Sequence, residues 1–142
     1  MSIQRPNISD SVDAPRPTSK PQLWTGRGLS TLVALFLLWH AILKLVKPPF
    51  VVKATRDLGY PQADIVGIGF VLLICTLLYL IPRTSILGAV LLTGYLGGAI
   101  ASQLRAQQPW FNIIFAFVFG CLLWAGLWLR NPRARTLLPL QA

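Results

Sequence analysis

Two ionisable side chains in an otherwise apolar stretch are the residues of this sequence best suited to chemistry. The segment LLWHAILKLVKPPF, residues 37–50, places His40 four residues before Lys44. On a helix this spacing puts both side chains on one face. An imidazole exchanges protons near neutral pH, and an ammonium group attracts anions. The pair predicts a site that moves a proton or binds an anionic group.

Each residue also has a purely structural interpretation. Lys44 can extend its carbon chain along the helix and place its ammonium group in water. His40 can stay neutral and form a hydrogen bond with a neighbouring hydroxyl or carbonyl group. An ionisable group inside a membrane helix is costly, which favours a functional role. The sequence leaves both interpretations open.

Four uncharged runs supply the elements that must position these side chains. They cover residues 28–43, 65–82, 84–104 and 110–129, and the first extends to residue 46 if Lys44 reaches water. With that extension each run, as a helix, is roughly 27 to 31 Å long, which matches the hydrocarbon core of a bilayer. Because lipid cannot hydrogen-bond to the backbone, spanning segments of this length are helices. The sequence therefore predicts an all-α membrane protein, a four-transmembrane-helix bundle with a disordered N-terminal tail.

The composition supports a membrane location and argues against a nucleic-acid partner. Hydrophobic residues make up 54% of the 142 residues, charged residues make up 12%, and the mean hydropathy is +0.61. The formal net charge is +9, but the basic residues flank the apolar runs and do not form one soluble face. That arrangement is typical of anchoring in a lipid bilayer.

The chain divides at the two ends of the apolar region. Residues 1–27 are the predicted disordered tail, because the first 22 are rich in Ser, Pro and charge and too poor in apolar groups to fold alone. Residues 28–131 are the membrane domain, and residues 132–142 are a short basic tail. An even number of helices puts both termini on one side, which then carries eight of the 13 basic residues. The positive-inside rule places both termini of this multi-pass protein in the cytoplasm.

The connection between the first and second runs is longer than the others. Within it, FVVKATRDLGYP places Phe50, Val51, Ala54 and Leu58 on one side of a helix and the charged residues on another. This amphipathic pattern predicts a short helix on the membrane surface. An irregular loop is the alternative, because so short a helix is marginal alone.

The third run carries two ridges of small residues, which let helix backbones approach closely in lipid. Gly94 and Gly98 form a GxxxG pair, and the neighbouring ridge consists of Ala89, Thr93, Gly97 and Ala101. We interpret Ala89, Gly94, Gly97 and Gly98 as packing residues that put this helix at the centre of the bundle. Association with a second copy of the chain, as a homo-oligomer, is the alternative.

Polar groups from different runs lie at comparable depths. Counted at the helical rise, His40 lies about 10 Å below the outer end of the first run, and Thr93 and Tyr95 lie near the middle of the bilayer. The candidate pocket is therefore His40, Lys44, Thr93 and Tyr95. The sequence contains no nucleophile triad, phosphate-binding loop or paired intramembrane carboxylates, so it predicts no catalytic residue.

The cysteines and the single histidine do not predict a metal site. Cys75 and Cys121 are isolated, and neither a CxxC nor a zinc-type spacing occurs. Both thiols come out at similar depths, so a disulfide or redox pair is the alternative to two small apolar residues. We expect the apolar role and no bound metal.

Three stretches resemble the DoxX-like family of small four-helix integral membrane proteins. They are LKLVKPPF at the end of the first run, LGYP after it, and LLYLIPRTSILGAVLLTGYLGGAIASQLR across the second and third runs. The similarity covers roughly residues 28–131. Its most specific parts are Lys44 with Pro48, and residues 88–101 with the preceding Pro82-Arg83. The resemblance implies a four-helix protein of the bacterial inner membrane.

The resemblance also implies a link to membrane redox chemistry, although it brings no catalytic motif. The family's namesake is similar to a subunit of a membrane thiosulfate–quinone oxidoreductase, and some relatives are linked to redox or oxidative-stress complexes. We therefore expect an accessory or interaction component of a membrane redox system, with a redox protein as partner and no cofactor of its own. The alternative is an oxidoreductase subunit that binds a quinone near His40, Lys44 and Tyr95.

Overall fold

The computed structural model describes residues 19–137 of the chain, and the side chains of residues 19–134. That part of the chain contains no strand and forms six helices: α1 (Lys20–Val46), α2 (Pro49–Asp57), α3 (Asp64–Leu80), α4 (Ser85–Arg105), α5 (Trp110–Arg130) and α6 (Pro132–Leu137). Helices α1, α4 and α5 are long and apolar enough to cross a membrane, whereas α3 is apolar but has only 17 residues. The predicted all-helical class is confirmed.

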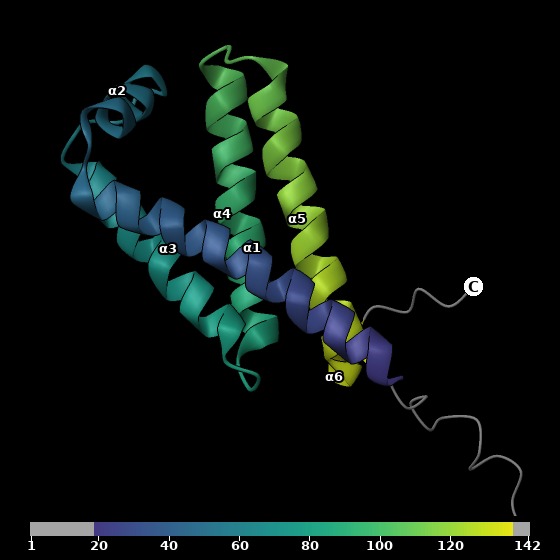
Figure 1. Ribbon diagram of the computed structural model, residues 1–142. Coiled ribbons are helices and arrows are strands. Elements are labelled where there is room, and N and C mark those ends of the chain that lie inside the picture. The colour runs from purple at the N-terminus through teal and green to yellow at the C-terminus, as the bar shows by residue number, and fades with distance from the viewer. Residues whose placement is uncertain (1–18, 138–142) are drawn as a thin grey trace, which may run out of the picture.

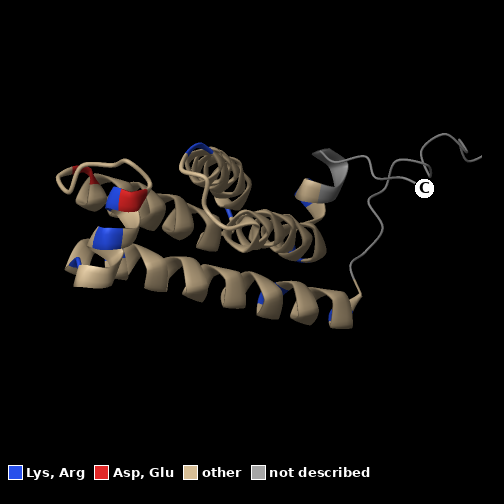
Figure 2. Cartoon of the chain, turned by 90° about the horizontal axis from the view of Figure 1, so that it is seen from above, with Lys and Arg blue, Asp and Glu red and all other residues tan. Residues whose placement is uncertain are grey.

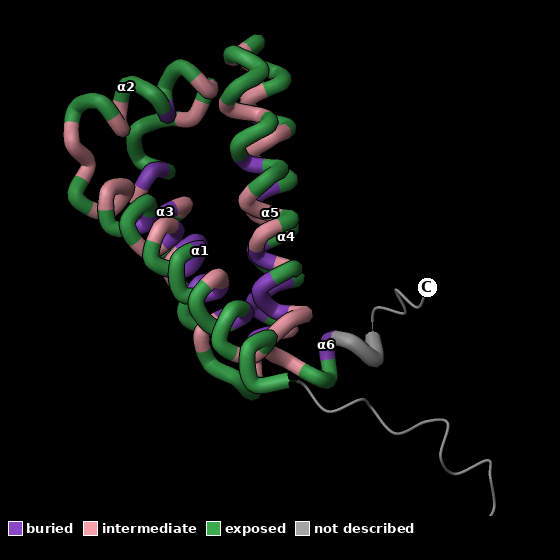
Figure 3. The backbone as a smooth tube through the Cα atoms, turned by 45° about the vertical axis from the view of Figure 1, so that its right-hand side comes forward, coloured by how far each residue is buried: buried purple, intermediate pink, exposed green. Residues whose placement is uncertain are grey.

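The four long helices form two pairs that meet at one end and separate at the other. Helix α1 packs on α3 and α4 packs on α5, while α1 also contacts α5 and α3 also contacts α4. Figure 1 shows α1 and α3 running diagonally towards the lower end of the upright α4–α5 pair, with α2 beside the upper ends. In Figure 3 the buried residues lie on the helix sides that face one another, and the outer sides are exposed.

Helix α1 begins at Lys20, so the predicted disordered tail is wrong for residues 20–27. The helix start is capped, because the Gln22 side chain accepts a hydrogen bond of 3.4 Å from the Ser19 backbone N–H. Gly26 then packs closely on α5, where an added Cβ would lie 2.7 Å from the Cβ of Leu129. This contact extends α1 beyond the uncharged run, and composition alone did not reveal it.

The predicted basic tail, residues 132–142, also needs correction. Its first six residues form α6, which packs on α5, and Ala134 is buried. The Asn131 side chain accepts a hydrogen bond of 3.1 Å from the Arg133 backbone N–H at the start of this helix. The rest of the two predicted tails, residues 1–18 and 138–142, lies outside the described residues.

The helix ends follow the local sequence as predicted. Helix α1 stops at Val46, because Lys47 adopts a left-handed conformation with φ 56° and two prolines follow. Helix α2 is the predicted short amphipathic helix. Helices α3 and α4 form a tight hairpin, in which the Thr84 hydroxyl donates a hydrogen bond of 2.9 Å to the Leu78 carbonyl.

Charged residues gather at the ends of the long helices and on α2. Figure 2 shows the acidic residues near α2 only, whereas basic residues also mark the opposite end of the molecule. Within the described part of the chain the acidic residues are Asp57 and Asp64, and the one ion pair joins Lys53 to Asp57 at 3.1 Å. The long apolar stretches between the ends are what a membrane-spanning segment requires.

The end where the helix pairs meet is organised around Tyr79 of α3, whose side chain is fully buried. Its hydroxyl oxygen lies 3.0 Å from the Ser30 hydroxyl of α1 and 3.0 Å from the Leu123 carbonyl of α5. The Arg130 guanidinium donates to the Tyr79 carbonyl and lies 4.7 Å from the centre of its ring. One residue of α3 therefore joins both α1 and α5.

Helix α4 reaches the same tyrosine through a glycine. A Cβ added to Gly88 would lie 2.2 Å from the Tyr79 backbone nitrogen and 2.5 Å from its Cα. Such contacts are shorter than any packed side chain allows, so the α3–α4 crossing needs a residue without a Cβ at this position.

The ridges predicted for this helix do not form the packed core of the chain. Gly94, Gly97 and Gly98 are exposed, and a Cβ added to any of them would meet no atom within 4 Å. Their interpretation as packing residues within the chain is therefore wrong. Ala89 is buried, and the close approach is made by the adjacent Gly88, which lies outside both ridges.

The Gly88→Ala variant is expected to be less stable than the wild type by about 1–3 kcal/mol, because the added methyl group forces the α3 and α4 backbones apart. Gly97→Ala is the matched control, since its methyl group enters open space. Thermal unfolding of both purified variants in the same detergent measures the difference. Equal stability of the two variants would contradict the packing described at Tyr79.

Candidate functional site

A pocket opens between α3 and α4 at the end where the helix pairs separate. Its volume is about 530 Å³, within the roughly 300–1,000 Å³ typical of small-molecule sites. Lys44 of α1 and Thr55 of α2 contribute to the wall. The remaining lining residues come from the following loop, α3 and α4: Leu58, Tyr60, Asp64, Gly67, Ile68, Val71, Gly94, Tyr95, Gly98, Ala99 and Ser102.

Three glycines make room for this pocket. Gly67 of α3 and Gly94 and Gly98 of α4 all line it, and a Cβ added to any of them would meet no atom within 4 Å. The same glycines are exposed, as is the neighbouring Val71 at 53%. The pocket is therefore open along the sides of α3 and α4, where lipid chains surround a membrane protein.

Two hydrogen bonds hold the segment after α2 over the pocket. The Tyr60 hydroxyl lies 2.6 Å from the Ser102 hydroxyl, which is itself 2.8 Å from the Gly98 carbonyl. Because a carbonyl only accepts, Ser102 donates to Gly98 and Tyr60 donates to Ser102. Arg105 also donates a hydrogen bond of 2.9 Å to the Leu58 carbonyl.

The turn in this covering segment depends on Gly59. Its φ is +85°, a conformation that residues with a Cβ adopt at a cost. An added Cβ would also lie 2.9 Å from a guanidinium nitrogen of Arg105. The turn thus brings the Leu58 carbonyl within reach of Arg105 and closes the outer end of the pocket.

Two polar groups of the pocket have no partner within the described part of the chain. The Lys44 ammonium forms no hydrogen bond or ion pair there, although the Asp64 carboxylate lines the same pocket. The half-buried Tyr95 also lines it, and its hydroxyl forms no hydrogen bond in that part of the chain. Both groups are therefore available to donate hydrogen bonds to a ligand.

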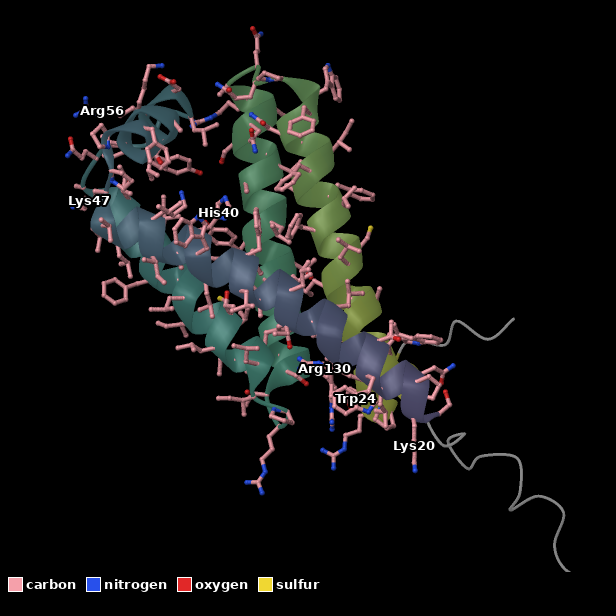
Figure 4. All side chains as sticks on the ribbon, viewed as in Figure 1. Lys20, Trp24, His40, Lys47, Arg56 and Arg130 are labelled. Atoms are coloured by element: carbon pink, nitrogen blue, oxygen red, sulfur yellow. The ribbon has the colours of Figure 1, made fainter. Side chains whose placement is uncertain are left out.

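His40 lies outside this pocket, one turn from Lys44 on the same helix. Figure 4 shows it on the side of α1 that faces α4 and α5. Its ring stacks on Phe36 with centroids 4.2 Å apart, and its Nδ1 lies 3.1 Å from the Phe36 carbonyl. Because that carbonyl only accepts, Nδ1 is the donor in this contact.

Thr93 is also separate from the pocket. Its hydroxyl donates a hydrogen bond of 2.8 Å to the Ala89 carbonyl and accepts one of 2.8 Å from the Trp124 indole. Both of these bonds are internal, and the second joins α4 to α5. The structure therefore brings Lys44 and Tyr95 of the predicted set together and gives Thr93 a packing role.

The cysteines do not contribute to this site. Cys75 is buried in α3 and Cys121 is exposed on α5, and both are free thiols. Among the residues that the structure describes, no group of three His, Cys, Asp or Glu side chains lies close enough to hold a metal ion.

Sequence reasoning missed several residues of the pocket, although part of the signal was present. Gly94, Gly98 and Ser102 follow one another at four-residue spacing, which places them on one helix face. Tyr60 and Thr55 carried no such signal, because Tyr60 reaches the pocket only through the turn after α2 and Thr55 only through the placement of α2 beside α3 and α4.

The arrangement is suited to holding a molecule that is largely apolar and carries a hydrogen-bond-accepting head. Ile68, Val71 and Leu58 supply apolar wall, and Lys44 and Tyr95 supply donors. The lateral opening suits an apolar tail that remains in lipid. The fold and the pocket thus define the class of the protein: an all-helical membrane protein with a ligand-sized cavity between two of its helices.

Comparison with known proteins identifies the family. The sequence profile of the DoxX-like family matches residues 28–126. No curated protein and no solved structure matches the chain. Because the match covers most of the sequence, the chain belongs to the DoxX-like family, as the motifs at the end of α1 and across α3 and α4 indicated, and it is an integral membrane protein.

The Gly98→Leu variant is expected to fill the pocket and lower the binding of an apolar fluorescent probe at least ten-fold. Gly97→Leu is the matched control, because this neighbouring exposed glycine does not line the pocket. Titration of the probe into both purified variants in detergent measures the difference. Equal losses would show that the probe binds elsewhere on the helix surface.

Proposed function

We propose that this DoxX-like protein binds a quinone-type lipid between α3 and α4 and serves as a binding component of a membrane redox system. The observation that carries the proposal is that the Lys44 ammonium and the Tyr95 hydroxyl line the same apolar pocket. Neither group has a hydrogen-bond partner within the described part of the chain. A quinone has two carbonyl oxygens that accept hydrogen bonds, a flat ring and an apolar tail. Each of these parts has a counterpart in the pocket.

The head of such a ligand would lie near Lys44 and Tyr95. Hydrogen bonds to a charged donor are stronger than those between neutral groups, so Lys44 dominates the binding of a carbonyl oxygen. A positive charge beside the ring also favours reduction steps that add negative charge to the ligand. The protein's own part is to bind, orient and polarise the head group, while a redox partner in the membrane supplies the electrons.

The tail would leave through the opening along α3 and α4. Gly67, Gly94 and Gly98 leave this side free of side chains, and Val71 provides an apolar edge. A ligand that arrives from the bilayer can therefore enter without first crossing water. The covering segment, held by Tyr60 and Arg105, separates the head group from the outer solution.

The same proposal takes all four long helices as membrane spans. Helix α3 is short, but its 17 residues extend about 25 Å, the lower limit for a span. It also packs on both α1 and α4, so it lies in the same apolar layer as they do. With four spans, the start of α1 and the end of α5 lie on one side of the membrane.

The distribution of basic residues supports a cytoplasmic location for both termini in a bacterial inner membrane. Eight basic residues belong to the terminal side: Arg5, Arg16, Lys20, Arg27, Arg83, Arg130, Arg133 and Arg135. Five belong to the other side: Lys44, Lys47, Lys53, Arg56 and Arg105. The excess favours retention of the terminal side in the cytoplasm.

Lys44→Met should lower quinone affinity by about ten-fold or more, because a hydrogen bond to a charged donor contributes roughly 1.5–3 kcal/mol. Tyr95→Phe should cost less, about two- to ten-fold, because a neutral hydrogen bond contributes roughly 0.5–1.5 kcal/mol. His40→Phe is the matched control on the same helix outside the pocket. Native mass spectrometry with a short-chain ubiquinone analogue measures occupancy in all three variants.

Loss of the quinone in His40→Phe alone would move the site to the Phe36 stack. A wild-type protein that retains no quinone, but co-purifies from its host with a defined redox protein, would instead support the accessory hypothesis. In that case the pocket has another occupant, and binding by the protein partner becomes the function to explain.

The proposed topology has its own test. A periplasm-active phosphatase fused after residue 142 should be inactive, and one inserted after Gln107, in the α4–α5 connection, should be active. Activity of the C-terminal fusion would reverse the orientation and put the covering segment on the cytoplasmic side.

A further inference from the structure

A second hollow lies on the far side of α2 from the quinone pocket. Its volume is about 570 Å³, and it shares no lining residue with the pocket between α3 and α4. The residues that line it are Lys47, Pro49, Val52, Lys53, Arg56, Asp57 and Gln62. Three of these seven side chains are cationic and one is anionic.

The charges of this hollow are only partly balanced. Lys53 pairs with Asp57 at 3.1 Å, which accounts for the single carboxylate. Arg56 donates a hydrogen bond of 2.7 Å to the neutral Gln62 side chain. The Lys47 ammonium forms no ion pair or hydrogen bond within the described residues. Two cations therefore face one hollow without an anionic partner.

The geometry of these cations is suited to a phosphate group. A guanidinium has five N–H donors, and Gln62 accepts from only one nitrogen of Arg56. The contact with Gln62 also restricts the orientation of the guanidinium, so less freedom is lost when an anion binds. Lys47 lies at the junction of α1 and α2, where its backbone N–H donates a hydrogen bond of 3.0 Å to the Leu43 carbonyl.

Exposed apolar residues next in sequence to the lining residues favour a phosphate that belongs to a lipid. Phe50 of α2 is 63% exposed, and Val46 at the end of α1 is 71% exposed. Both lie within a few residues of the cations, so the same short region offers an apolar surface to lipid chains and positive charge to head groups. Figure 4 shows Lys47 and Arg56 together at the α2 end, remote from Lys20 and Arg130.

We propose that Lys47 and Arg56 bind the phosphate of one anionic phospholipid and thereby fix α2 at the membrane surface. Each basic residue close to a bilayer raises the affinity for anionic head groups about five-fold. A lipid with a net negative head group should bind in preference to a zwitterionic one, because the ammonium of the latter meets the uncompensated cations. This site is independent of the proposed quinone function, since no residue is shared.

The test uses the full chain in nanodiscs of equal parts phosphatidylglycerol and phosphatidylcholine, released into native mass spectrometry. The wild type should retain phosphatidylglycerol preferentially. The Lys47→Gln/Arg56→Gln double variant should bind it about 25-fold more weakly, at about five-fold per charge removed. The matched control is Arg27→Gln/Arg83→Gln, which removes the same charge at the opposite end and should keep the wild-type preference.

Two outcomes would overturn the proposal. Equal loss of phosphatidylglycerol in the double variant and in the control would show that net charge alone attracts the lipid. In the second outcome, the wild type shows no preference for phosphatidylglycerol over phosphatidylcholine, and excess inorganic phosphate displaces the bound phosphatidylglycerol. That result would assign the hollow to a soluble phosphate. Circular dichroism of the double variant, expected to be unchanged, confirms that the comparison concerns folded protein.

Discussion

The buried hydroxyl of Tyr79 is the constraint on which the arrangement of the helices depends. A polar group inside a membrane protein has no water to bond with, so it must find its partners within the fold. Those partners are the Ser30 hydroxyl of α1 and the Leu123 carbonyl of α5. The Tyr79 hydroxyl can reach both only where α1, α3 and α5 converge. Gly88 brings α4 to the same point. Because the α1–α3 pair is inclined to the α4–α5 pair, the two pairs meet at this end and separate at the other (Figure 1).

The two proposed binding sites both follow from that separation. Where the pairs diverge, α3 and α4 no longer fill the space between them, and their glycines leave a pocket that a covering segment closes from above. Helix α2 fills part of the outer end, and its other side forms the basic hollow. At the converged end, Arg130 and Asn131 bond internally to Tyr79 and Ser85. At the open end, cations without an anionic partner line both hollows: Lys44 in one, and Lys47 and Arg56 in the other.

Much of the helical framework could be predicted because it depends on local properties. Uncharged runs of membrane length become helices, two prolines after Lys47 stop one of them, and a short Pro-containing link makes a hairpin. The errors concern contacts between distant segments. The start of α1 at Lys20 depends on Gly26 packing against α5, and spacing alone could not separate Gly88, which packs, from Gly94, which lines a cavity.

The sequence by itself determined the class of the protein, its family and the face that Lys44 shares with His40, because composition and helical period depend only on neighbours along the chain. Tertiary structure decided what those residues face. The crossing of the helix pairs directs Lys44 and Tyr95 into one pocket, leaves His40 stacked on Phe36, and engages Thr93 with Trp124. The angle between helices is set by a few buried contacts far apart in the chain, and no local pattern encodes that angle.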